Sequence, residues 1–325
     1  MNLQRRQFLR LTASAAVLSA MSSFAWSQTY PAQPVRVMVG YPAGGTYDLL
    51  ARLMAQWLSE HLGQPFVIEN RPGAASNIAT ETVVRAMADG YTLLLAGPAN
   101  AINASIYDKL NFYFIRDIAP VAGITREPLV MTVHPSLPTN SVPEFIAYAK
   151  ANPGKINMAS PGNGSSGHVA GELFKMMTGV AMVHVPYHGA APALTDLLGG
   201  QVQVYFGAAP ALIEYVRSGK LRALAVTSAT RCHAMPDIPT VGEFVAGYEA
   251  SAWYGIGAPK ATPVAIIARI NQEINAALGD SGIKARLADQ GSTVIPGSPA
   301  DFGRLIAGET EKWAKVIRAA NIKVG

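Results

Sequence analysis

Short apolar runs rich in β-branched residues alternate along the chain with segments whose apolar residues recur every three or four positions. The run at residues 35–39 predicts a strand, and the apolar spacing over residues 47–61 predicts a helix. A second helix is expected at residues 77–88, and further strands at residues 64–70, 91–96, 156–159, 182–185, 202–206 and 221–227. This alternation is typical of an α/β fold with mainly parallel sheets flanked by helices.

Two extended segments, residues 129–134 and 251–258, interrupt this alternation and are flanked by proline or glycine. We interpret them as the two crossing segments of a hinge between two lobes. The first lobe would comprise residues 28–128 and 254–325, and the second lobe residues 129–253.

The first 27 residues follow a different pattern. Arg5, Arg6 and Arg10 precede an uncharged apolar stretch, and small residues follow around Ala25. This order predicts an export signal that is removed, since the apolar stretch is far shorter than the roughly 20 residues that span a membrane. The arginine pair resembles the twin-arginine motif, with an ordinary secretory signal as the alternative. Cleavage is expected near Ala25 or Ser27, and the mature protein is expected in the periplasm.

Charge changes the picture only slightly. Loss of three arginines and no acidic residue with the signal lowers the formal net charge from +5 to +2. The remaining chain has no Lys/Arg-rich run with interleaved aromatic residues, so no nucleic-acid partner is expected. The single cysteine, Cys232, cannot form an internal disulfide and is expected to be inert.

The turn at residues 41–48 is the first candidate binding element. Ligands of open parallel sheets bind beyond the carboxyl ends of the strands. Gly44 and Gly45 leave the backbone accessible where a helix begins, and the free N–H groups of a helix start suit an anion. The alternative is a purely structural helix start, capped by Thr46 or Asp48.

The turn at residues 160–168 is the second candidate. Gly162, Gly164 and Gly167 spell G-x-G-x-x-G, so a nicotinamide-dependent oxidoreductase is an alternative. A dinucleotide site would need an acidic residue about 20 positions on, but residues 184–188 contain none. The serines and asparagine of this turn favour a small polar ligand.

Catalytic and metal sites are not expected. Neither Ser165 nor Ser166 lies in a G-x-S-x-G motif. His168, His184 and His188 fall in a turn, a strand and a loop, without the helical or cysteine spacing of zinc ligands. His168 is expected as a cap or ligand contact and His184 as a core residue. No cofactor is expected.

Several motifs in order resemble the substrate-binding proteins of tripartite tricarboxylate transporters, also called the Bug receptors or the TctC family. The resemblance covers essentially the whole mature chain. It rests on residues 41–48 with Ala51-Arg52, and on residues 69–74, 89–93, 162–168, 185–193, 199–202 and 218–225.

The resemblance implies a two-lobed type II periplasmic-binding-protein fold that closes on a carboxylate, held by one turn from each lobe and partly through ordered water. It implies a receptor rather than an enzyme, a monomer that delivers its ligand to a two-subunit membrane permease. A sensory binding protein without a permease is the alternative. The ligand-binding residues expected from it are Tyr41, Ala43, Gly44, Gly45, Thr46, Asp48, Ala99, Asn100, Ser160, Asn163, Gly164, Ser165, Ser166, His168, Tyr187 and Gly207.

One departure from the family concerns residues 205–209, where many relatives have an aspartate after the strand and this chain has none. Loss of that acid removes a partner for an amino group or a hydroxyl group of the ligand. We therefore expect a dicarboxylate or an aromatic carboxylate as ligand, rather than an amino acid.

Overall fold

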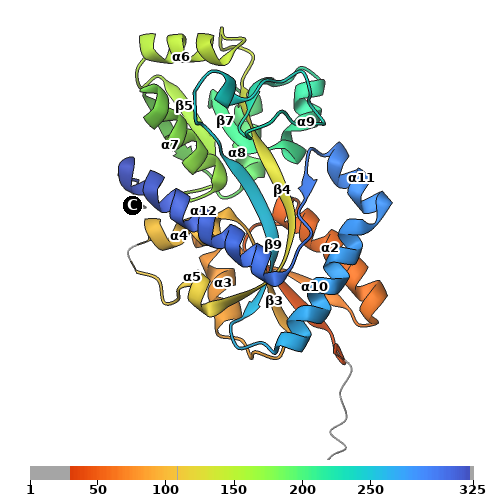
Figure 1. Ribbon diagram of the computed structural model, residues 1–325. Helices are drawn as coiled ribbons and strands as arrows, with labels where there is room; N and C mark the ends of the chain where they lie inside the picture. Colours follow the sequence, from red (N-terminus) through yellow and green to blue (C-terminus); the bar gives the residue numbers. More distant parts are fainter. Residues whose placement is uncertain (1–29, 108, 323–325) are drawn as a thin grey trace, which may run out of the picture. The chain divides into compact units, whose positions relative to one another are not determined.

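The computed structural model describes residues 30–107 and 109–322 (Figure 1). The predicted signal peptide lies outside these residues. The chain divides into two compact units, residues 1–32 and 33–325, and all that follows concerns the second unit.

Ten strands of the described chain form a continuous sheet in the order β2-β1-β3-β9-β4-β7-β5-β6, with β8 and β10 paired to β4. Strands β1, β2 and β3 are mutually parallel, as are β5, β6 and β7, whereas β4 and β9 run antiparallel to their neighbours. The strand bounds are β1 Val35–Val39, β2 Phe66–Asn70, β3 Thr92–Ala96, β4 Ile118–Val133, β5 Ile156–Ser160, β6 Met182–Pro186, β7 Val204–Ala208, β8 Arg222–Val226, β9 Ser251–Pro259 and β10 Thr293–Val294.

The long strand β4 belongs to both parts of the sheet. Its residues up to Pro128 pair with β9, and its residues from Leu129 pair with β7 and β8. The chain returns to the first part at Ser251, where β9 begins opposite Pro128. The two predicted crossing segments thus lie within β4 and β9 (Figure 1). The exact limits of the lobes stay a prediction.

Helices follow the parallel strands and flank the sheet, so the predicted α/β class is confirmed (Figure 1). The helix bounds are α2 Thr46–Leu62, α3 Asn77–Val84, α4 Pro98–Ile106, α5 Phe114–Asp117, α6 Val142–Ala151, α7 Ser166–Thr178, α8 Ala190–Leu198, α9 Ala209–Arg217, α10 Val264–Gly279, α11 Ser281–Asp289 and α12 Pro299–Ala319, with short 3₁₀ turns η2 Ala74–Ser76 and η3 Val241–Glu243. None of the described helices is both long and apolar enough to cross a membrane.

Among the described residues, one apolar core cluster lies on each part of the sheet. Strand β7 with helices α8 and α9 builds one, and β3, α3 and α12 build the other. In the second cluster the ring of Trp253 packs edge-on against Phe302 of α12, with ring centroids 5.7 Å apart. Helix α12 is further fixed to β4 by Arg126, which binds Glu309 at 3.0 Å. Such a charged hydrogen bond is worth roughly 1.5–3 kcal/mol.

The helix predicted over residues 77–88 ends at Val84. The carboxylate of Asp89 accepts a hydrogen bond from the N–H of Tyr91 at 3.0 Å, and Gly90 between them has a φ of 83°. This tight turn leads the chain directly into β3 beside β1. The strand predicted at residues 202–206 is shifted to Val204–Ala208, and the N–H of Gln203 just before it donates to the carbonyl of Asn157 in the neighbouring strand β5.

Candidate functional site

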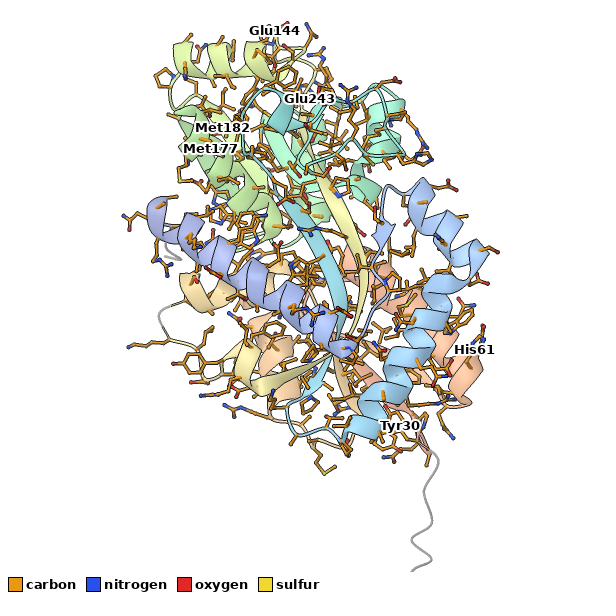
Figure 2. All side chains as sticks on the ribbon, viewed as in Figure 1. Tyr30, His61, Glu144, Met177, Met182 and Glu243 are labelled. Atoms are coloured by element: carbon orange, nitrogen blue, oxygen red, sulfur yellow. The ribbon has the colours of Figure 1, made fainter. Side chains whose placement is uncertain are left out.

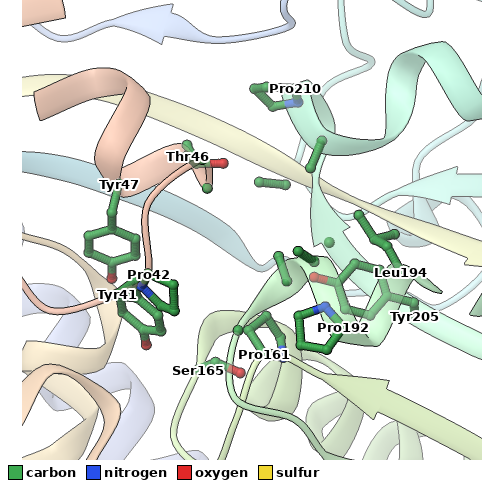
Figure 3. Close-up of a pocket in the computed structure, with 18 of the residues that line it drawn as sticks. Tyr41, Pro42, Thr46, Tyr47, Pro161, Ser165, Pro192, Leu194, Tyr205 and Pro210 are labelled. Atoms are coloured by element: carbon green, nitrogen blue, oxygen red, sulfur yellow. The ribbon is translucent and has the colours of Figure 1, made fainter. Parts of the chain in front are cut away.

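A cavity of about 490 Å³ opens at the carboxyl ends of β1, β5, β6 and β7 (Figure 3). Its walls come from the loops that follow these strands and from the first turns of α2, α7, α8 and α9, while Tyr254 of β9 closes one side. Loops from both parts of the sheet therefore face one space. A pocket of this size accommodates a small molecule.

The loop between β1 and α2 is held open by its glycines. Gly44 has a φ of 86°, which L side chains rarely adopt, and Gly45 is the N-cap and has no side chain to cap the helix. The N–H groups of Thr46 and Tyr47 lie in the first turn of α2, where no helical acceptor exists. Both residues line the cavity, so the N–H groups of this helix start are suited to bind an anion there.

Asp48 fixes this loop from behind. Its buried carboxylate accepts hydrogen bonds from the N–H of Gly44 at 3.0 Å, from Arg52 at 2.9 Å and from Asn70 at 3.0 Å. Burial opposes ionisation, but the hydrogen bonds from Arg52, Gly44 and Asn70 outweigh it and lower the pKa of Asp48. The carboxylate consequently forms its hydrogen bonds around this loop, and Asp48 is not among the residues that line the cavity.

The turn between β5 and α7 presents Ser165 and Ser166 to the cavity. Ser165 is the N-cap of α7, and its hydroxyl accepts a hydrogen bond from the N–H of His168 at 3.3 Å. A Cβ atom on Gly167 would collide with the carbonyl oxygen of Phe206, so only glycine lets this turn pack against β7. The three glycines of G-x-G-x-x-G thus have packing and conformational roles within the turn.

Two stacked imidazoles support the same turn. The rings of His168 and His184 lie 3.8 Å apart and nearly parallel. The Nδ1 atom of His168 accepts a hydrogen bond from the N–H of Gly164 at 3.1 Å, and Nε2 of His184 lies 2.6 Å from the hydroxyl of Ser160. Burial, the neighbouring His184 and Lys175 lower the pKa of His168 to about 3, and burial and Lys175 lower that of His184 to about 4. Both rings are therefore neutral near pH 7.

Tyrosine rings form the side of the cavity next to α2. The ring of Tyr47 lies 4.4 Å from that of Tyr41 and 4.8 Å, edge-on, from that of Tyr254. Burial is the main cause that raises the pKa of each of these three hydroxyls above its usual value. The rings thus offer apolar surface and uncharged hydroxyl groups.

The cavity wall has no acidic or strongly basic side chain among the described residues. Among the described residues that line it there is no aspartate, glutamate, lysine or arginine, and His188 is the one ionisable side chain besides the tyrosines. A charged ligand must therefore be bound by backbone N–H groups, hydroxyl groups and helix dipoles. The dipole of one helix contributes only about 0.3–1 kcal/mol, and each hydrogen bond to the charged group about 1.5–3 kcal/mol.

Half of the predicted binding residues lie in the cavity wall, from both turns and from β7. They are Tyr41, Ala43, Gly44, Gly45, Thr46, Ser165, Ser166 and Gly207.

The other predicted residues lie behind the wall. Besides Asp48 and the turn residues Ser160, Asn163, Gly164 and His168, they are Ala99, Asn100 and Tyr187. Asn100 accepts a hydrogen bond from the N–H of Gly97 at 2.8 Å and donates one to Thr80 at 2.7 Å, so it holds the start of α4. Ala99 donates its N–H to the hydroxyl of Tyr47.

Tyr187 donates its hydroxyl to Asp196 at 2.6 Å, and burial together with this carboxylate raises its pKa to about 12. It therefore ties the loop after β6 to α8 rather than lining the cavity.

Several lining residues were not predicted from sequence. The most prominent are Leu49, Pro192, Leu194, Tyr205 and Tyr254. Their apolar and aromatic side chains at helix and strand positions are indistinguishable in sequence from core residues. A signal was available only for Pro192, which lies in a family motif.

The chain is similar to a known family of receptors. A family model described as the tripartite tricarboxylate transporter family receptor matches residues 50–322. BugT of Bordetella pertussis is 38% identical over 317 residues, which cover 96% of this chain and 95% of BugT.

Three solved structures are similar over nearly the whole chain. Rpa4515 of R. palustris, solved with adipate, is 39% identical with a TM-score of 0.88 and covers 91% of this chain and 100% of its own. The periplasmic binding protein BugD is 31% identical with a TM-score of 0.85, over 91% and 100%. MatC from Rhodopseudomonas palustris, with bound malate, is 30% identical with a TM-score of 0.83, over 89% and 100%.

These similarities confirm the two-lobed periplasmic-binding-protein fold and the resemblance drawn from the sequence motifs. The chain belongs to the tripartite tricarboxylate transporter family of receptors, the Bug receptors.

Proposed function

We propose that this protein is an extracytoplasmic receptor that binds a small carboxylate in the cavity and delivers it to a membrane permease. The observation that carries the proposal is that two helix starts line the same cavity. The start of α2 has no side-chain cap, and the start of α7 is rich in serine. The described residues that line the cavity include no aspartate, glutamate, lysine or arginine. One carboxylate would accept hydrogen bonds from backbone N–H groups of both starts. The similar proteins solved with adipate and malate support a carboxylate ligand.

Family membership supports a proposal for the partner and the compartment. We propose a permease of two membrane subunits, a monomeric receptor, and a signal peptide that is cleaved near Ala25 or Ser27 to release the protein into the periplasm. Mass spectrometry of the exported protein should give a new N-terminus within a few residues of Ala25. An intact N-terminus on the periplasmic protein would contradict the cleavage.

We further propose that the protein releases its ligand unchanged and is not an enzyme. The described residues that line the cavity include serines, threonines and His188. None of these lining residues has a carboxylate that could orient a base. Proton NMR of a carboxylate incubated with the protein should show unaltered ligand. Appearance of a product that depends on the protein would overturn this assignment.

A proline at the first position of α7 tests the site directly. Ser166→Pro removes one backbone N–H that the helix does not use, and Ser165 already has the extended ψ of 158° that a following proline requires. Helix α12 begins with Pro299 in the same position, so this chain tolerates the arrangement. We expect the Kd of a bound carboxylate, measured by calorimetry, to rise about 10- to 100-fold.

The matched control is Ser166→Ala, which removes the hydroxyl and keeps the N–H. It should change the Kd less than Ser166→Pro does, at an unchanged melting temperature. Equal, small effects of both variants would exclude the first turn of α7 as the carboxylate site.

A further inference from the structure

The wall opposite the loop after β1 is apolar. Leu194 and Leu198 of α8 and Ala211 and Tyr215 of α9 line it and pack on the apolar cluster of this part of the sheet. Figure 3 shows Leu194 on the side of the cavity away from Tyr41 and Pro42. A ligand held at the starts of α2 and α7 therefore extends toward hydrocarbon.

The helix starts on this far wall offer fewer donors than those of α2 and α7. Pro192 is the third residue of α8 and Pro210 the second of α9, and proline has no N–H. Both rings line the cavity (Figure 3). The N–H of Gly189, before α8, is already bound to the carbonyl of Pro161 at 3.0 Å. A second carboxylate would meet proline rings and leucine side chains beside the hydroxyl groups of Thr195 and Tyr215, with no lysine or arginine among the described lining residues.

A neutral donor at this end is the hydroxyl of Tyr205. Tyr205 of β7 is 1% exposed and lines the cavity. Figure 3 shows this hydroxyl directed into the cavity. Gly207 makes this ring position accessible, because a Cβ atom there would collide with the ring of Tyr205. Burial raises the pKa of Tyr205 above its usual value, so the hydroxyl stays protonated.

We propose that the ligand is a monocarboxylate with an apolar body, an aromatic or medium-chain aliphatic acid, whose far end is uncharged. Any polar group at that end would be an acceptor or hydroxyl facing Tyr205. This inference rests on the proposed carboxylate-binding function and narrows its ligand class. The proposed ligand differs from adipate, the dicarboxylate with which the similar protein Rpa4515 was solved, because adipate has a charge at both ends.

Calorimetric titration of the exported protein with two matched pairs of acids tests the inference. Hexanoate and adipate share a six-carbon chain, and benzoate and terephthalate share a ring, but the second member of each pair carries a second carboxylate. We expect the monocarboxylate to bind at least tenfold more tightly in at least one pair. Tighter binding of the dicarboxylate in both pairs would overturn the inference while the proposed function stands. If none of these acids and neither malate nor citrate binds, the proposed function itself fails.

Variants of the far wall sharpen the test. Leu198→Lys places a cation where the second carboxylate would lie and should shift the preference at least tenfold toward adipate, whereas Leu198→Met should not. If Leu198→Lys does not fold, Ala211→Lys serves the same purpose on α9. An unchanged preference in the folded lysine variant would overturn the assignment of this wall.

Tyr205→Phe isolates the neutral donor. It should weaken 4-hydroxybenzoate several-fold more than benzoate, because only the first ligand has a polar far end. Equal effects on both ligands would remove Tyr205 from the ligand contacts.

Discussion

Glu127 is a carboxyl group without solvent exposure, placed where β4 passes from one part of the sheet to the other. One oxygen accepts hydrogen bonds from Ser292 at 2.9 Å and Thr125 at 3.4 Å, while the other, Oε2, has no partner among the described residues. Burial raises the pKa of Glu127 to about 7, because its effect is larger than that of the hydrogen bonds from Ser292 and Thr125, which lower the pKa.

This raised pKa gives a testable pH dependence. The folded state holds the proton more tightly than the unfolded state, whose glutamate has a pKa near 4.5. The stabilisation by the protonated Glu127 is therefore fully present below pH 4.5. It is lost as the pH rises toward 7, which lowers the free energy of unfolding by about 3 kcal/mol in all. Urea unfolding of the natural protein and Glu127→Gln at several pH values should show the variant gaining relative stability over this range. The exposed Glu214→Gln is the control, and parallel curves for the natural protein and Glu127→Gln would contradict the prediction.

Single residues also mark the limit of what the sequence predicts. Gly44, Gly45, Ser165 and Ser166 were predicted because loop composition after a strand carries information about backbone access. Tyr205 was not, since a tyrosine in an apolar strand is equally consistent with a core residue and only packing over Gly207 directs its hydroxyl into the cavity.

At the scale of elements, the turn between β5 and α7 depends on two neutral imidazoles. His168 accepts the N–H of Gly164 only while its Nδ1 atom is unprotonated. Its pKa of about 3 lies below the 6.5 of an unperturbed histidine, so the unfolded state binds more protons between these values. The stabilisation is complete above pH 6.5 and is lost as the pH falls toward 3.

His168→Asn should reduce this acid sensitivity, because an asparagine oxygen can accept the same N–H and does not titrate. The slope of unfolding free energy against pH between 6 and 4.5 should fall by about 1.4 kcal/mol per pH unit. Denaturant titrations check this, with the exposed His233→Asn as control. An undiminished slope in His168→Asn would show that His168 does not cause the acid sensitivity.

The elements themselves were predicted well from periodicity. The strand at residues 35–39 and the helix after it have the predicted positions, because a buried strand and an amphipathic helix each impose a distinct spacing on apolar residues. The end of α3 at Val84 and the start of β7 at Val204 differ from the predicted positions, because apolar periodicity does not encode the residue at which an element ends. The pairing of β4 with strands of both parts is a long-range feature that required the structure.

At the scale of the whole molecule, the low net charge of the protein and the lack of charged side chains in the cavity wall affect how ligand binding depends on salt. Residues 28–325 have a formal charge of +2, and the described residues that line the cavity include no aspartate, glutamate, lysine or arginine. Long-range attraction of an anion is therefore small.

Ligand binding should consequently be insensitive to salt. Raising NaCl from about 0.02 to 0.5 M should change the Kd of a bound carboxylate less than about threefold, because little Coulomb attraction exists for the salt to screen. Calorimetric titration at both salt concentrations measures this, with Leu198→Lys as a control that should become salt-sensitive. A tenfold or larger loss of affinity in the natural protein would point to a charged group at the site.

The proposed binding of the carboxylate by backbone N–H groups would also separate two kinds of sequence change during divergence. A backbone amide is shared by nearly all amino acids, so most substitutions at Thr46 or Ser166 leave the donor in place. Side chains on α8 and α9 can meanwhile vary one at a time without loss of the carboxylate contact. A lineage can thus acquire a new nutrient through single-residue steps on one wall while every intermediate still binds acids, which provides a simple route to large sets of paralogous receptors on this scaffold.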